Sequence, residues 1–148
     1  MISEICYRAF CTFCIIAVCS LVTACGGDKE EKKVSAESLL AMEAFHLAET
    51  LRTGYLKNNR KVLENNSTQE AYRDLIGAIK QFDRAELSFT PTWVDISDSA
   101  VQLTISWKGT WTVHNKTQEE RGSALFVLEG TPLKLVQVQR ENPFRQPE

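Results

Sequence analysis

The chain has 148 residues, of which 17 are Lys or Arg and 19 are Asp or Glu, so its formal net charge is −2. This length supports one domain with a hydrophobic core, and the near balance of charge gives no electrostatic case for nucleic-acid binding. All five cysteines lie within residues 1–25, so the rest of the chain can form neither a disulfide nor a cysteine metal site.

Residues 1–24 have the pattern of a secretory signal peptide. Arg8 precedes an apolar run over residues 9–22, although Glu4 weakens the positive charge of this region. The run is too short to span a membrane comfortably and is followed by small residues, as at a cleavage site. We therefore expect this segment to be removed from the mature protein.

The end of this segment, Leu21-Val22-Thr23-Ala24-Cys25, resembles the lipobox of bacterial lipoproteins, in which an aliphatic residue and two small residues precede a cysteine. The resemblance implies that Cys25 is lipidated at its sulfur, that the signal is cut before it, and that the new N-terminus is acylated. Two alternatives remain open, which are an ordinary signal peptide cut nearby and an uncleaved anchor.

Residues 25–34 are interpreted as a flexible tether, because they are polar, glycine-led and of mixed charge. A flexible chain of ten residues spans about 17 Å r.m.s., so we expect the following domain close to a membrane surface. By resemblance to Gram-negative lipoproteins, Gly26 after the cysteine favours the outer membrane, facing the periplasm. The expected location is therefore the bacterial cell envelope, with the membrane as a partner through the lipid anchor.

The first of three predicted helices covers residues 36–52. Ser35 is the expected N-cap, and Gly54 predicts a break near Thr53. The apolar side chains recur with helical spacing and form one stripe. These residues are Leu40, Ala44, Leu47, Ala48, Leu51 and Tyr55.

Two shorter helices follow. The second is predicted over residues 55–63 and is ended by Asn65-Asn66. The third is predicted over residues 68–82, because Ser67-Thr68-Gln69-Glu70 matches a capping box. Its apolar stripe consists of Tyr72, Leu75, Ile76, Ile79 and Phe82.

The stretch over residues 100–114 predicts a long antiparallel strand with one buried face. Apolar and polar residues alternate along it, and this period of two is that of a half-buried strand. Gly109 is the odd position without a side chain, so we expect a bulge or bend there. The remaining odd positions are Val101, Leu103, Ile105, Trp107, Trp111 and Val113.

The remaining strands are predicted on either side of this one. A kink is expected near Pro91, because the side-chain parity changes there, and Asn115-Lys116 is the expected hairpin tip. The third strand has apolar residues on both faces, and Asn142-Pro143-Phe144 is expected to end the ordered chain. The predicted ranges are 87–96, 121–128 and 133–140.

Three helices followed by about four antiparallel strands make an α+β layout, with the helices packed on one face of the sheet. The strand over residues 101–113, Arg121-Gly122 before an apolar strand, and the short last strand resemble the C-terminal half of the NTF2-like (SnoaL-like, cystatin-like) superfamily. The resemblance implies a strongly curved sheet that wraps the helices into a cone with a pocket, in one domain over residues 35–145. Many members carry an extra strand pair between the second and third helices, but here Asn65-Asn66-Ser67 is too short for it.

Enzymes of the NTF2-like superfamily, such as ketosteroid isomerases and dehydratases, place Asp, His or Tyr groups inside the cone for proton transfer. Such a group must reach the reacting atom, yet the apolar face of the central strand offers no carboxylate and no histidine. Asp95 and Asp98 flank a turn, and His114 is expected at the surface. His46 lies beside the stripe of the first helix, either on the surface or on the rim of a pocket.

Six aromatic residues are the candidate lining of an apolar pocket, since ligand pockets are lined by aromatic side chains with few polar groups. The simpler interpretation is core packing, in which each tyrosine hydroxyl finds a partner. The six are Tyr55, Tyr72, Trp93, Trp107, Trp111 and Phe126.

Two functions remain open from the sequence. The first is a non-catalytic, membrane-anchored module that binds or assembles an envelope protein or a small apolar ligand, with no catalytic residue, no metal and no cofactor. The second is a small-molecule enzyme of the same fold, of isomerase, dehydratase or cyclase type, that uses Tyr55, Tyr72 or His46 as acid or base. A closed, tryptophan-packed cone would favour the first, and an open cavity with a perturbed His or Asp would favour the second.

Overall fold

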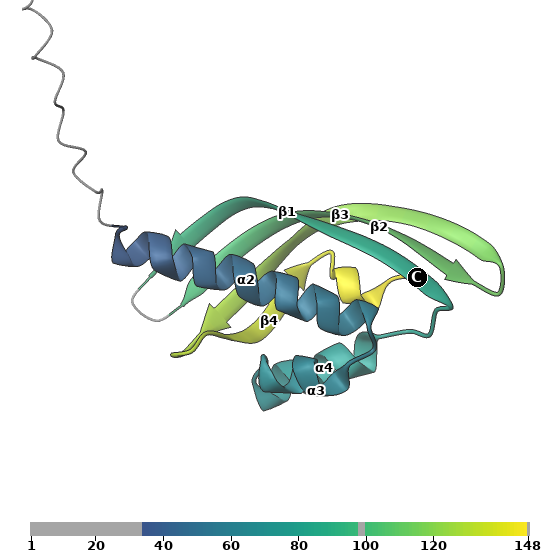
Figure 1. Ribbon diagram of the computed structural model, residues 1–148, viewed down its shortest axis with the longest axis horizontal. Coiled ribbons are helices and arrows are strands. Elements are labelled where there is room, and N and C mark those ends of the chain that lie inside the picture. The colour runs from purple at the N-terminus through teal and green to yellow at the C-terminus, as the bar shows by residue number, and fades with distance from the viewer. Residues whose placement is uncertain (1–33, 98–99, 148) are drawn as a thin grey trace, which may run out of the picture. The chain divides into compact units, whose positions relative to one another are not determined.

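The computed structural model describes residues 34–97 and 100–147. Three helices precede a curved, four-stranded antiparallel sheet with strand order β1-β2-β3-β4, and α2 lies along the concave face of that sheet (Figure 1). The predicted α+β arrangement is therefore confirmed. The predicted signal peptide, Cys25, Asp98 and the tether up to residue 33 lie outside the described residues. The elements are α2 (Ala36–Leu56), α3 (Arg60–Asn65), α4 (Gln69–Ala78), β1 (Arg84–Ile96), β2 (Val101–Val113), β3 (Lys116–Glu129), β4 (Lys134–Arg140) and the 3₁₀ helix η1 (Pro143–Arg145).

The first helix does not break at Gly54, as the sequence predicts, but continues to Leu56. Gly54 is buried, and a Cβ atom there would lie 2.9 Å from Cγ1 of Val62 in α3. The glycine is therefore needed for the close approach of two helices and not for a helix end. As a consequence, Tyr55 belongs to α2 and points into the core, with 1% of its surface exposed.

The second and third helices are shorter than predicted, and each starts later in the chain than the residue predicted for it. Asn59 caps α3 by accepting a hydrogen bond from the Val62 backbone N–H. Thr68, not Ser67, caps α4, because Ser67 instead forms an isolated bridge with Leu135 of β4. The described segment between α3 and α4 contains this bridge and no strand pair, as the sequence predicts.

The central strand follows its predicted parity. Its odd-numbered side chains face the core from Val101 to Trp111, and the intervening polar side chains are exposed or half-buried. Of the bulge or bend expected at Gly109, the bulge is excluded, because β2 pairs with both neighbours there without a register shift. A side chain at Gly109 would overlap the indole ring of Trp111, so the glycine makes room for that ring.

The kink predicted near Pro91 is confirmed as a register shift between Pro91 and Trp93. The shift turns Trp93 to the outer face of the sheet, where 68% of its surface is exposed. The next hairpin turns one residue earlier than predicted, at His114 and Asn115, which both have positive φ. Two-residue turns with positive φ at both positions fit the twist of a hairpin.

The outer face of β3 is less covered than the apolar pattern of its two faces suggests. Ala124, Phe126 and Leu128 are buried on the core side, whereas Leu125 and Val127 are half-buried.

The larger difference from the prediction is at the end of the chain. Buried residues continue to Pro147. The sequence predicted that the ordered chain ends at Phe144 and that the domain ends at residue 145, so both predicted ends come too early.

Candidate functional site

The concave face of the sheet holds four of the six predicted pocket-lining residues. Tyr55 from α2, Trp107 and Trp111 from β2, and Phe126 from β3 are each at most 3% exposed. The two indole rings meet edge to face, with centroids 6.3 Å apart. The structure therefore brings these residues together as a packed core cluster.

The Tyr55 hydroxyl is paired on both sides. It accepts a hydrogen bond from Trp111 Nε1 at 2.8 Å and donates one to the backbone carbonyl of Gln146 at 2.9 Å. Burial raises the pKa of the Tyr55 phenol to about 12, the Trp111 bond opposes that rise, and the charge of Glu120 adds to it. The phenol therefore keeps its proton at neutral pH, and its proton is committed to a backbone oxygen.

The last described residues, Glu141 to Pro147, form a segment that we call the C-terminal plug. It runs across the concave face, and Pro143, Phe144, Gln146 and Pro147 are buried. The ring of Phe144 is fully buried and lies 5.4 Å from Tyr55, 6.1 Å from Phe89 and 5.9 Å from Phe126 between centroids. The plug occupies the place where a cone would otherwise be hollow.

Hydrogen bonds fasten the start of the plug to the sheet. Trp107 Nε1 donates to the Glu141 carbonyl at 2.8 Å, and the Ser123 backbone N–H donates to the Glu141 carboxylate at 2.8 Å. Gly122 leaves the space in which the Glu141 carboxylate and the Trp107 ring meet. Trp107 and Tyr55 thus each bind a backbone carbonyl of the plug, one near either end of it.

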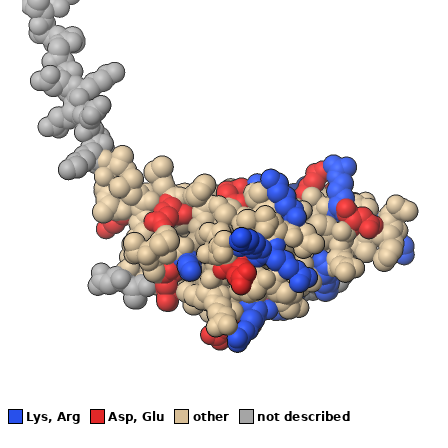
Figure 2. Space-filling model, turned by 60° about the horizontal axis from the view of Figure 1, so that its bottom comes forward, with Lys and Arg blue, Asp and Glu red and all other residues tan. Residues whose placement is uncertain are grey.

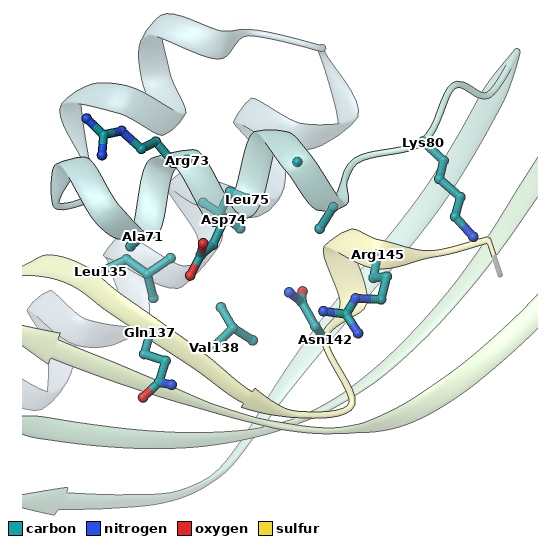
Figure 3. Close-up of a pocket in the computed structure, with 12 residues that line it drawn as sticks. Ala71, Arg73, Asp74, Leu75, Lys80, Leu135, Gln137, Val138, Asn142 and Arg145 are labelled. Carbon is teal, nitrogen blue, oxygen red and sulfur yellow. The ribbon is translucent and has the colours of Figure 1, made fainter.

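A groove of about 730 Å³ lies beside the plug, between α4, β4 and η1 (Figure 3). Leu75, Leu135 and Val138 supply its larger apolar side chains. Gly77 in α4 leaves the wall open, because nothing lies within 4 Å of where its Cβ would be. Its volume exceeds that of the hollow of about 430 Å³ beside Phe82 and Val113.

The charged residues that line the groove are Arg73, Asp74, Lys80 and Arg145. Figure 3 shows Asp74 pointing from α4 toward Val138, and Arg145 beside Asn142 at the η1 end. None of the four forms an ion pair with another described residue. Figure 2, which looks from the α3–α4 side, shows basic side chains across this face with acidic ones between them. Lys80 and Arg145 against the single carboxylate of Asp74 give the groove a net positive charge, while the Arg73 side chain points away from it (Figure 3).

A comparison with solved structures identifies the architecture. The chain is similar to a nuclear transport factor 2 (NTF2-like) superfamily protein from Salmonella enterica subsp. enterica serovar Typhimurium str. LT2, with a TM-score of 0.60 over 76% of this chain and 96% of that one. The fold is NTF2-like. The identity is 14%, so the likeness concerns the fold and not the activity. The sequence matches no protein-family model and no curated protein.

The other predicted site residues lie away from the concave face of the NTF2-like domain. Tyr72 is half-buried and packs against the edge of the core, and Trp93 is on the outer face. His46 is exposed beside a separate hollow of about 330 Å³ between α2 and α3. His114 is exposed in the β2–β3 turn, where its backbone N–H donates to the Asp83 carboxylate at 2.7 Å. Asp95 is exposed on β1.

The groove residues were missed by the sequence analysis. Arg73 and Asp74 look like the solvent-facing side of an amphipathic helix, and Arg145 follows a residue expected to end the order. The one available signal was Phe144 between Pro143 and Arg145, since an aromatic residue in a polar tail often has a packing partner.

Among the described residues, no group of three His, Cys, Asp or Glu side chains could hold a metal ion. No helix in residues 34–97 and 100–147 is long and apolar enough to cross a membrane.

Proposed function

We propose that this chain is a lipid-anchored protein of the bacterial cell envelope whose NTF2-like domain is a non-catalytic binding module. One observation carries the second half of the proposal. The concave face, where an enzyme of this fold would need its acid or base, is filled by the chain's own aromatic side chains and by the C-terminal plug. The alternative, a small-molecule enzyme, would have to use a hollow of about 430 Å³ whose lining includes Tyr55, Asp83 and His114, but Tyr55 is only 1% exposed there and its hydroxyl proton is bound to the Gln146 carbonyl.

The first half of the proposal rests on the N-terminal sequence. An apolar run without charge leads into Leu21-Val22-Thr23-Ala24-Cys25, and a polar, glycine-led tether separates this cysteine from the domain. Gly26 favours delivery to the outer membrane if the cell is Gram-negative. The domain would then work at the periplasmic face of that membrane.

The groove between α4, β4 and η1 is the proposed binding site. Lys80 and Arg145 are charges without an ionic partner in the described chain, and an Arg guanidinium binds a carboxylate or phosphate through two parallel hydrogen bonds. Val138 is half-buried and offers apolar contact beside them, while Leu75 and Leu135 are buried beneath the groove. The ligand class supported by this lining is an anion with an apolar part. The small apolar ligand predicted for the cone would instead have to displace Phe144.

The anchor is tested by fractionation. Cys25→Ser should abolish lipidation and release the protein from membranes after detergent-free lysis, because each buried acyl CH₂ contributes about 0.8 kcal/mol to membrane binding. Cys19→Ser, inside the predicted signal peptide, is the matched control and should leave the protein in the membrane pellet. A Cys25→Ser protein that is cleaved and still pellets would show that the lipobox interpretation is wrong.

The groove is tested by ligand-induced stabilisation. Inorganic phosphate and a medium-chain carboxylate should raise the Tm of the purified protein, since a ligand that binds only the folded state stabilises it. The double variant Lys80→Gln, Arg145→Gln should lose this rise, and Lys116→Gln, which removes an exposed charge at the start of β3, should keep it. Equal shifts in both variants would remove the groove from the proposal.

A further inference from the structure

Large apolar side chains are strongly exposed at four positions of the described chain. They are Val34 at 55%, Leu39 at 57%, Met42 at 62% and Trp93 at 68% exposed. Scattered apolar residues on a surface need no explanation, but a cluster of them does. Three of these four lie within residues 34–42, where the chain enters the domain.

The fourth residue, Trp93, belongs to strand β1. β1 ends beside the start of α2 (Figure 1), and Glu37, Ser38 and Ala41 of α2 line a shared hollow with Val94 and Ile96 of β1. Trp93 directly precedes these β1 residues. Val34, Leu39 and Met42 therefore mark one end of the domain, which we call the entry end, whereas Trp93 lies on the outer face of the sheet, on the side away from α2. The opposite end of β2 and β3 carries the polar turn His114-Asn115.

The occupant of the entry end follows from the length of the tether. Cys25 lies nine positions before Val34, and a flexible chain of that length spans about 16 to 17 Å r.m.s.. If Cys25 is lipidated, as the proposed function holds, the entry end is kept at the lipid surface at a high effective concentration. Exposed apolar side chains at such an end suit the interface between headgroups and acyl chains.

The charges at the entry end select the kind of lipid surface. Glu37 and Glu43 are exposed on α2 near Leu39 and Met42. They offset Lys32 and Lys33, which precede Val34 in the sequence, so these charges give no net attraction to the negative potential of an anionic leaflet. We propose that the entry end, through Val34, Leu39 and Met42, docks on a zwitterionic lipid surface and holds the domain against the membrane, with the hairpin tip at Asn115 pointing away. This inference rests on the proposed lipid anchor.

Site-specific fluorescence tests the docking in the full, lipidated chain. Once Cys25 is modified and the signal removed, the mature protein has no free thiol, so Met42→Cys can be labelled alone with an environment-sensitive dye. Asn115→Cys is the matched control, because it is also exposed and lies at the opposite end of the strands. Both proteins are reconstituted into phosphatidylcholine vesicles.

The dye at position 42 should show a blue-shifted emission and a several-fold rise in intensity on reconstitution, and the dye at position 115 should show neither. Equal emission at the two positions overturns the docking while the lipid anchor stands. A rise at position 42 that grows with the density of protein on the vesicles would mean that the surface contacts a second copy of the chain. A larger rise in anionic vesicles would mean that charge, and not apolar contact, drives the docking. Either result overturns the inference. Wild-type protein that takes up the dye at Cys25 contradicts the anchor itself and the docking with it.

Discussion

The concave face of the sheet and the groove beside α4 share one segment of chain but differ in chemistry. Phe144 points from the C-terminal plug into the concave face and is fully buried there, whereas its neighbour Arg145 lines the groove and is exposed. Adjacent residues thus close one hollow and form the wall of another. If the groove binds a ligand as proposed, the binding site of this chain lies outside the cone.

The energetic meaning of the two regions also differs. On the concave face, aromatic burial and paired hydrogen bonds stabilise the folded chain, since each aromatic residue removes a large apolar area from water. In the groove, unpaired exposed charges contribute little to folding. The first region should therefore respond to substitution through stability, and the second through ligand binding.

Removal of the Phe144 ring should have the largest effect. Phe144→Ala is expected to lower the free energy of unfolding by about 3–5 kcal/mol, because a cavity remains where the ring contacts Tyr55 and Phe126. Denaturant titration measures this loss against a total of about 5–15 kcal/mol. The matched control is Arg145→Ala, which should change stability by less than about 0.5 kcal/mol. Similar losses in the two variants would contradict the assignment of one residue to the core and the other to the groove.

Alkaline pH should weaken the concave face through Tyr55. Its pKa is raised to about 12 in the folded state, against about 10 in the unfolded chain, so folding favours the protonated phenol. Below pH 10 both states hold the proton and the full contribution is present. Between pH 10 and pH 12 the unfolded state releases its proton first, and about 2–3 kcal/mol of stability is lost.

The control for this loss is Tyr55→Phe, which has no proton to release at this position. Its stability should be lower at neutral pH, because Trp111 Nε1 and the Gln146 carbonyl lose their partner. Its decline between pH 10 and pH 12 should be shallower than that of the wild type. Parallel curves for the two proteins would show that Tyr55 does not carry the alkaline transition.

Substitutions at two glycines, one on the concave face and one beside the groove, should give the smallest changes in stability. Gly109→Ala should destabilise the protein by about 1–3 kcal/mol, because the added methyl group overlaps the Trp111 ring. Gly77→Ala should stabilise it by about 0.5–1 kcal/mol, since alanine is the better helix former and space is open there. Thermal unfolding of both variants gives the two signs, and a stabilising Gly109→Ala would mean that the concave face is loosely packed.

The sequence predicted the features that depend on local periodicity. The alternation from Val101 to Trp111 fixed the central strand and its buried face, and the parity change at Pro91 located the register shift. The likeness of the strands was sufficient to predict the NTF2-like fold. These signals are local because side-chain direction in a strand repeats every two residues.

The sequence could not reveal features that depend on contacts between distant segments. Gly54 was interpreted as a helix end because its partner Val62 in α3 was not known to approach it. Trp93 was grouped with the core tryptophans because a parity change in the sequence does not show at which residue the inward-facing side chains switch from odd to even positions. The plug was missed because the burial of Phe144 depends on Tyr55 and Phe126, which lie far away in the sequence.

The plug also bears on the order of events during folding. The hydrogen bond from Tyr55 to Gln146 joins residues 91 positions apart, and that from the Leu133 backbone to Glu43 joins residues 90 apart. Contacts of such high sequence separation form slowly, because a long loop must close before they give any stabilisation. During synthesis, α2 emerges well before the residues that complete its packing, so the core should close only when the last strand and the plug are present. If the chain is exported, as the proposed lipid anchor requires, such a late closure leaves it incompletely folded at least until its last residues have been synthesised.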